Sequence, residues 1–431
     1  MFKKFIINIF TIAILLGSPV SIIAQSQISS PYSGFGIGII NTRSNVINSS
    51  MGGVSYAMQN PYFVNTLNPA SYVVFDSLSF IADAAFSIIS SNLRTSDVFQ
   101  KGTNARLDYL TIGLPLTRYW RTSLGILPFS DLGYNIISSK EYVFPDTVMV
   151  NYNYIGEGGL MQLYWGNAFK LHKGLSIGLN ISYLFGTLNT VKYVEFEEKN
   201  FLNSRIAQIR FLDGINLSAG LQYFLTLKED HRLGFGFVYE NSIFMLSRKN
   251  QLISYYTGDY VPSVVFDTLI AQGGKDAERS YTRIPQIIGG GISYSYKDRI
   301  LIGADVSWNN WAKFSLDGIQ DTLKNDLICA LGIQFTPNPL SSKYLSRMNF
   351  RVGGRYSTGN LKINGTPINS YSLSVGLGFP IKTFTTRSSV NIMFEYGKMG
   401  TMTNDLILQN YMKFSFNFIL QEKWYQRVKL E

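Results

Sequence analysis

The sequence predicts an all-β protein that spans a membrane as an antiparallel β-barrel of about 14 strands. Segments of about ten residues alternate apolar and polar side chains, as the two faces of a strand require. Charged residues make up only 15% of the chain and aromatic residues 14%. Long and short links between the alternating segments also succeed one another along the chain. A mean hydropathy of +0.06 argues against a bundle of membrane helices.

The N-terminus has the layout of a secretory signal. Lys3 and Lys4 precede an apolar run from Phe5 to Leu16, and small residues follow up to Ala24-Gln25. The run is shorter than the roughly twenty residues of a spanning helix. We therefore expect residues 1–24 to be a cleaved signal peptide that directs the chain to the outer membrane. No cysteine follows the predicted cut, which argues against a lipoprotein anchor.

Residues 25–76 do not alternate. They contain Met51-Gly52-Gly53 and Leu67-Asn68-Pro69-Ala70, and such glycine clusters and Asn-Pro pairs favour turns over long regular elements. About fifty residues of this kind are too many for a first strand. Two interpretations stay open: a plug, or hatch, folded into the barrel lumen, and a periplasmic arm that pairs with another molecule.

Residues 77–420 are the predicted transmembrane barrel. Tyr411–Phe418 and Ser389–Tyr396 alternate most clearly, with large apolar residues on one face and Ser, Asn, Lys or Glu on the other. A soluble sandwich would also alternate, but it would expose many contiguous aromatic residues, which soluble surfaces rarely carry. Twelve or sixteen strands remain alternatives to fourteen. The predicted strands are 77–91, 106–116, 121–139, 158–170, 174–188, 206–226, 231–248, 284–297, 299–313, 326–336, 347–358, 370–381, 387–399 and 408–420.

The links predict which rim faces which compartment. Longer links follow the odd-numbered strands, including 249–283 with its Gly273-Gly274-Lys275-Asp276 turn, and short turns such as Lys228-Glu229-Asp230 mostly follow the even-numbered ones. Outer-membrane barrels have short periplasmic turns and long extracellular loops. Both termini are therefore expected on the periplasmic side, with residues 421–431 as a short periplasmic tail.

The order of these features resembles the FadL-type family of outer-membrane transporters for hydrophobic compounds, in the version common in Bacteroidota-like sequences. The resemblance rests on Met51-Gly52-Gly53, on Asn68-Pro69-Ala70 and on a third strand broken by Pro128. It implies a 14-stranded barrel, a hatch that contains Asn68, Pro69 and Ala70, and passive uptake of apolar ligands. It also implies a lateral opening in the third strand, marked by Gly125, Pro128 and Gly133. Proline and glycine weaken strand pairing, which agrees with this role, although Pro128 at a strand terminus is an equal alternative.

The expected lumen departs from that family. Ser372, Ser374, Arg351 and Lys413 fall on the inward face, whereas a tunnel for acyl chains needs mainly apolar lining. The leading hypothesis is passive uptake of hydrophobic small molecules. The alternative is a non-transporting, partner-binding subunit of an outer-membrane protein assembly or secretion complex, with the loop 249–283 as a docking element.

No enzyme, cofactor or metal site is expected. Gly174-Leu175-Ser176-Ile177-Gly178 matches a nucleophile-elbow pattern, but its serine lies inside an alternating strand instead of a strand-to-helix turn. His172 and His231 fall in predicted periplasmic turns. The net charge of +10 is spread along the chain, which disfavours nucleic acid and favours outer-membrane lipid and lipopolysaccharide at the rims. A hydrophobic small molecule and other outer-membrane or surface proteins are the remaining expected partners.

Overall fold

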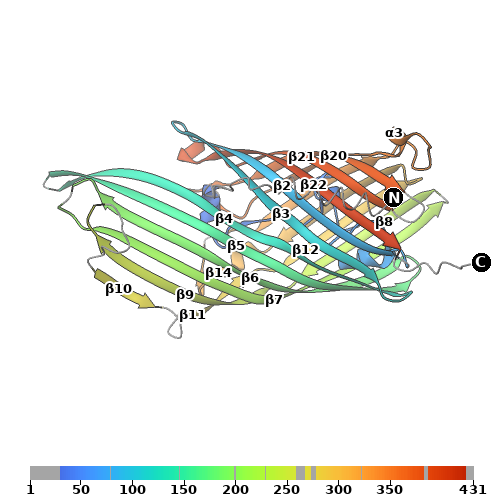
Figure 1. Ribbon diagram of the computed structural model, residues 1–431, viewed down its shortest axis with the longest axis horizontal. Coiled ribbons are helices and arrows are strands. Elements are labelled where there is room, and N and C mark those ends of the chain that lie inside the picture. The colour runs from blue at the N-terminus through green and yellow to red at the C-terminus, as the bar shows by residue number, and fades with distance from the viewer. Residues whose placement is uncertain are drawn as a thin grey trace, which may run out of the picture.

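The computed structural model describes residues 30–423, except 78, 145, 199, 229, 259–266, 273–277, 322 and 383–386. The predicted signal peptide and the Gly273-Gly274-Lys275-Asp276 turn lie outside the described residues. The long strands form one closed antiparallel wall around a lumen (Figure 1).

The strands of the wall are β2 (Ser79–Arg94), β3 (Phe99–Pro115), β4 (Trp120–Phe144), β5 (Asp146–His172), β6 (Leu175–Phe196), β7 (Asn203–Lys228), β8 (His231–Glu240), β9 (Ile243–Tyr256), β11 (Glu278–Ile284), β12 (Ile287–Tyr296), β13 (Ile300–Asn309), β16 (Asp326–Phe335), β17 (Asn349–Ser357), β20 (Ser370–Lys382), β21 (Arg387–Met399) and β22 (Leu408–Lys423). The short elements are η1 (Pro31–Gly34), β1 (Ile39–Ile40), α2 (Val46–Ser49), η2 (Pro69–Val74), β10 (Asp267–Gln272), η4 (Trp311–Lys313), β14 (Ser315–Leu316), β15 (Ile319–Gln320), α3 (Tyr344–Arg347), β18 (Lys362–Ile363), β19 (Thr366–Pro367) and η5 (Thr403–Asp405).

The sixteen wall elements form 14 strands, because two of the strands are each interrupted and so appear as two elements. Residues 218–228 of β7 pair with β8, and residues 203–213 of β7 pair with β9. β8 and β9 therefore form a single strand broken at 241–242. In the same way β11 and β12 form one strand that pairs with β9 and β8. The barrel closes where β22 pairs with β2 along their whole length. Each of the 14 predicted segments overlaps one of these strands, and the predicted fold class is confirmed.

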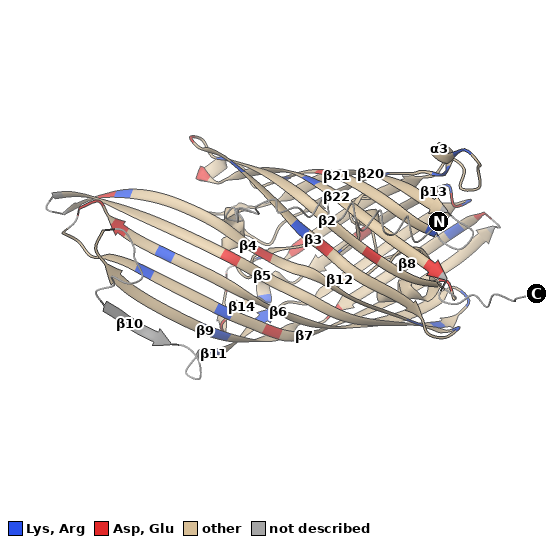
Figure 2. Cartoon of the chain, viewed as in Figure 1, with Lys and Arg blue, Asp and Glu red and all other residues tan. Residues whose placement is uncertain are grey.

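The two faces of the wall differ as the alternation predicts. On β20, Leu373 and Val375 are 67% and 50% exposed on the outside, whereas Ser374 between them is 2% exposed. Charged residues are sparse along the strands (Figure 2). Apolar side chains on the outside and polar ones inside are what a lipid-embedded barrel needs. None of the helices in the described ranges is long and apolar enough to cross a membrane.

The wall is much taller on one side than on the other. β5 and β7 have 27 and 26 residues, whereas β13 and β17 have 10 and 9. A spanning strand needs only about 9–11 residues, so β4 to β7 and β9 rise far beyond the opposite wall (Figure 1). We call the end where β2 begins and β22 ends the near rim and the opposite end the far rim.

The predicted long links on the tall side are therefore mostly strand, which corrects the sequence interpretation. β4 and β5 pair without interruption from Leu132↔Gly158 up to Phe144↔Asp146, and β9 continues to Tyr256 inside the predicted 249–283 loop. Outside the membrane, a strand no longer needs an apolar face toward lipid. The point where the alternation stops in the sequence is therefore not the point where the strand ends. The predicted tail also begins too early, since β22 runs to Lys423 and residues 424–431 lie outside the described part.

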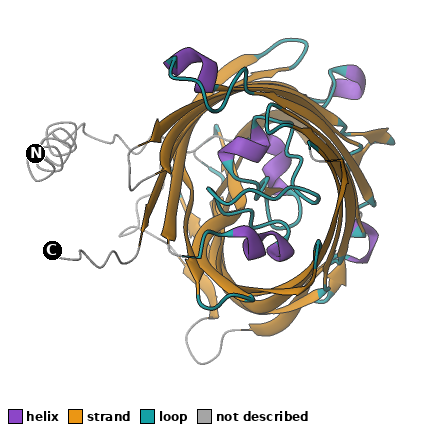
Figure 3. Cartoon of the chain, turned by 90° about the vertical axis from the view of Figure 1, so that its right-hand side faces the viewer, coloured by secondary structure: helices purple, strands orange, loops and turns teal. Residues whose placement is uncertain are grey.

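The lumen is occupied from both ends. Seen along the barrel axis, helices and loops fill the interior (Figure 3). Near-rim contents come from residues 42–76, whose Val46, Phe63, Tyr72 and Phe75 form one apolar cluster with inward-facing wall residues. Residues 30–41 lie nearer the far rim, where Tyr32 and Ile37 belong to a second cluster. Far-rim contents come from the folded-in links after β13, β17 and β21. Their buried apolar residues join this second cluster together with wall residues: Trp311, Phe314, Leu323, Leu361, Ile368 and Leu406.

Candidate functional site: the filled lumen and the seam between β3 and β4

Residues 30–76 touch the wall through a ring of inward-facing glycines. A Cβ atom added to any of these glycines would overlap residues 50–75 or force them to shift, and the glycines come from ten different strands. Glycine permits this close approach because it has no side chain. The segment is therefore seated directly against the wall. We call the ring the glycine belt: Gly113, Gly166, Gly178, Gly220, Gly236, Gly289, Gly303, Gly332, Gly353 and Gly376.

The predicted hatch motif lies against β6 and β7. Asn68 is the N-cap of η2, where its Oδ1 accepts the N–H of Ala70 at 3.1 Å, and Pro69 occupies the first turn. The Nδ2 atom of Asn68 donates to the carbonyl of Tyr56 at 2.7 Å and to that of Leu221 in β7 at 3.3 Å. Asn-Pro-Ala thus starts a short helix and ties it to the wall.

A buried ion pair anchors the same segment. Arg43 reaches Glu240, at the end of β8, with two parallel bonds of 3.0 and 2.9 Å, and both side chains are about nine-tenths buried. Asn216 donates a third bond to the carboxylate at 2.6 Å. Burial alone lowers the pKa of the Arg43 guanidinium, but the Glu240 carboxylate raises it, and the pKa lies above its ordinary value. Arg43 therefore stays charged inside the lumen.

A second polar anchor lies on β13. One carboxylate oxygen of Asp305 accepts the backbone N–H groups of Ser55 and Tyr56 at 2.6 and 2.9 Å. Two adjacent N–H groups on one carboxylate fix both the position and the direction of the backbone at this point. The segment is therefore held by specific bonds to the wall as well as by shape.

The wall has a seam between β3 and β4. Their pairing extends from Pro115↔Arg121 only to Leu110↔Ile126, although both strands continue far beyond that point. Pro128 lies two residues above the last pair, in the interior of β4, and the register of β4 against β5 shifts between Pro128 and Ser130. Pro128 therefore marks a bulge beside the seam, and the alternative of a strand terminus is wrong.

The N-terminal segment lines the edge of β4 that β3 leaves. Ile39 and Ile40 pair antiparallel with Asp131 and Ser130. Further up, the N–H of Ser30 donates to the carbonyl of Gly133 at 3.0 Å, and the N–H of Gly133 donates to Oγ of Ser33 at 3.0 Å. Residues 30–41 thus form hydrogen bonds with the edge of β4 from Phe129 to Gly133. Of the predicted opening residues, Gly125 lies below the seam, Pro128 at its base and Gly133 where these bonds end.

Side chains also bridge the seam. Arg106 on β3 forms ion pairs with Asp131 on β4 and, at 3.1 Å, with Asp108 on its own strand. Lys413 on β22 adds a second cation to Asp108 at 3.1 Å. The Arg106 guanidinium also donates to Oδ1 of Asn41 at 2.5 Å. The seam is thus crossed by an ion-pair network instead of a backbone ladder.

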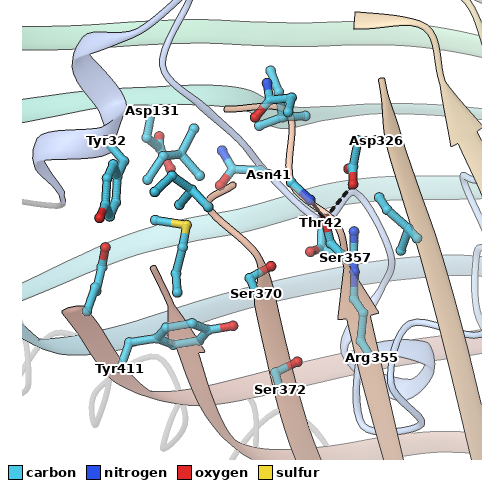
Figure 4. A pocket seen from close by; sticks show the side chains of 18 of the residues that line it. Tyr32, Asn41, Thr42, Asp131, Asp326, Arg355, Ser357, Ser370, Ser372 and Tyr411 are labelled. Carbon is cyan, nitrogen blue, oxygen red and sulfur yellow. Dashed lines mark hydrogen bonds between the residues drawn. The ribbon is translucent and has the colours of Figure 1, made fainter. Parts of the chain in front are cut away.

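A cavity of about 320 Å³ lies in the lumen beside this network. Tyr32 and Asp131 border one side of it, and Asp326 and Arg355 border the opposite side (Figure 4). Its lining mixes apolar residues such as Ile39 with these charged ones. The cavity is therefore amphipathic and reaches the wall at the seam.

Pro128, which the sequence singled out, lies beside the seam, but sequence reasoning missed the glycine belt, the Arg43–Glu240 pair and Arg106. The belt glycines were visible as inward positions on alternating strands, and only their contacts with residues 50–75 reveal a common role. Ser176 is buried within β6, 3.5 Å from Gln59. His231, which the sequence placed in a turn, is the first residue of β8 and lies 2.7 Å from the Tyr294 hydroxyl.

Solved structures with a similar fold include a hydrocarbon channel and a toluene transporter. A monoaromatic hydrocarbon channel, CymD, has a TM-score of 0.57 at 13% identity, covering 90% of this chain and 100% of its own. The toluene transporter TbuX of Ralstonia pickettii has a TM-score of 0.58 at 12% identity, with coverages of 89% and 100%. A Pseudomonas aeruginosa FadL homologue has a TM-score of 0.55 at 12% identity, with coverages of 89% and 98%. At these identities the likeness establishes the fold.

The sequence comparisons give the family. No curated protein matches the chain. A family model described as BamG matches residues 1–431, which include the barrel and the segment 30–76 in its lumen. By that match, the chain is a member of the BamG family.

Proposed function

We propose that this barrel is a non-transporting subunit of an outer-membrane protein assembly or secretion complex. The observation that carries the proposal is the filled lumen, in which residues 30–76 lie against the glycine belt and are fixed by Arg43 and Asp305. A plug that is bonded on all sides behaves as a structural core, because displacing it would leave buried charges without partners. The work of such a barrel lies on its outer surfaces. The BamG family name itself points toward outer-membrane protein assembly.

The location and processing of the chain belong to the same proposal. We place it in the outer membrane of a Gram-negative, Bacteroidota-like cell, after cleavage of residues 1–24. Residues 25–76 then act as the hatch, the near rim faces the periplasm and the far rim the cell surface. Short turns such as 297–299 at the near rim and the tall wall at the far rim support this orientation.

Depletion of the protein tests the proposal. We expect folded β-barrel proteins to disappear from the outer membrane while uptake of toluene and fatty acids stays unchanged. Folded barrels are quantified by their gel mobility with and without heating. Purification in mild detergent is expected to recover a second protein in stoichiometric amount. Normal barrel levels after depletion, or recovery of this polypeptide alone, would contradict the proposal.

Passive uptake of hydrophobic molecules is the second candidate, because the cavity beside the seam favours it. Trp311 lines this cavity, so a bound aromatic ligand should change its fluorescence. Under this candidate, titration with toluene quenches the purified wild-type protein saturably, and Trp311→Phe abolishes that quenching. Absence of saturable quenching, together with normal toluene uptake by cells that lack the protein, excludes the candidate.

A further inference from the structure

The upper part of β4 has a free backbone edge. Above Gly133, the described residues of β4 pair only with β5, and this pairing continues to the top of the strand. β3 does not follow, since its pairing with β4 ends at Leu110↔Ile126. The segment 134–143 is therefore an edge strand of about ten residues, or about 33 Å. It contains no proline that would block an added strand.

The backbone groups on this edge can be assigned. The N–H and C=O of Gly133 both face the N-terminal segment, through Ser33 and Ser30. In an antiparallel strand, alternate residues direct both groups to the same side. The register of β4 above Ser130 shows no shift, so the residues that present both groups to the seam are Asn135, Ile137, Ser139, Glu141 and Val143.

Large apolar side chains stand beside this edge. Ile137 and Val143, on the edge strand itself, are 70% and 75% exposed. β4 needs roughly ten residues to cross the membrane, and Ile137 lies about seven residues beyond them, toward the far rim. Proteins normally cover or blunt such an edge, because an open apolar edge recruits other strands.

We propose that the edge of β4 from 134 to 143 binds an extended segment of a partner protein by strand addition. The chain already uses the adjoining edge in this way, since Ile39 and Ile40 pair with Ser130 and Asp131. The docking edge continues that interface. A partner segment with alternating β-branched or aromatic residues would pair with the free backbone groups and pack on Ile137 and Val143.

The chain's own N-terminus is too short to fill the edge. Cleavage after Ala24 leaves residues 25–29 before Ser30, and five extended residues span about 17 Å, half of the free edge. The remaining half is left open to another molecule. This inference deepens the proposed function, because it locates where the assembly partner binds.

Site-specific photo-crosslinking tests the inference in cells that produce the full chain. With p-benzoylphenylalanine at Ser139, we expect one discrete adduct, larger than the chain by the mass of a different protein. Ile137→Pro removes one seam-facing N–H and is expected to reduce the adduct at least tenfold. Ile137→Ala keeps that N–H and is expected to retain most of the adduct. Heat-dependent gel mobility checks that each variant folds, and Glu141→Pro replaces Ile137→Pro if the latter does not.

Three outcomes would overturn the inference: no protein adduct, an adduct that contains lipopolysaccharide or a second copy of this chain, or an adduct that the proline variants leave unchanged. The result is separable from the proposed function. Loss of the adduct in Ile137→Pro with normal outer-membrane barrel levels keeps the docking edge and rejects the assembly role at that edge. An adduct that Ile137→Pro leaves unchanged, together with loss of outer-membrane barrels on depletion, rejects the docking edge and keeps the assembly role.

Discussion

Glu240→Ala is expected to destabilise the folded barrel by about 3–5 kcal/mol, because it leaves the Arg43 guanidinium buried without a counter-charge. Arg43 holds Glu240 through two bonds of 3.0 and 2.9 Å, and the side chains are only 10% and 7% exposed. Its other polar contact, with Gln162, is a neutral one at 3.5 Å and cannot replace the carboxylate. The measurement is the urea midpoint of the loss of folded gel mobility in detergent.

A double-mutant cycle separates the energy of the ion pair from the effect of the volume that the two side chains fill. Arg43→Met alone leaves the Glu240 carboxylate with Asn216 as a neutral partner, and it should also be destabilising. The double variant Arg43→Met, Glu240→Leu removes both charges and is expected to be closer to wild type than either single variant. Additive effects in the cycle would mean that the two side chains do not depend on each other.

The membrane explains how much of the fold the sequence predicts. Within the lipid-facing band, each strand must present apolar residues outward, and this requirement made all 14 segments visible as alternation. Above the band the requirement ends. The pairs from Asn135↔Ile155 to Phe144↔Asp146 continue as regular ladder through a sequence that no longer alternates clearly. The height of the wall was therefore missed, and with it the strand character of part of 249–283.

The sequence predicts the polar character of the lumen wall but not the segments that fill the lumen. Polar inward positions such as Ser374 followed from alternation, and Pro128 indicated a weak place in the third strand. Neither feature says what fills the lumen. The pairing of Ile39 with Asp131 and the contact of Gly353 with Met51 join residues about 90 and 300 positions apart, and no local pattern encodes such contacts.

Gly236→Ala is expected to cost about 1–3 kcal/mol of stability, because its methyl group would overlap the carbonyl of Tyr56. That carbonyl is backbone and accepts bonds of 2.7 Å from both Asn68 and Gln222, so it cannot swing aside as a flexible side chain would. The change is read as a lower urea midpoint and as faster protease cleavage within residues 30–76, whose contact with the wall is loosened.

Gly290→Ala on the neighbouring strand β12 is the matched control. Its added Cβ would meet only the carbonyl oxygen of Gly236, at 3.8 Å, which is ordinary van der Waals contact. Both variants add one methyl group to a glycine of the wall, so propensity effects are similar and only the contact with residues 30–76 differs. Equal stability of the two variants would mean that the segment is loosely held. A selective loss in Gly236→Ala would instead make the segment part of the folding core, and a core that must stay packed is poorly suited to open and close for each transported molecule.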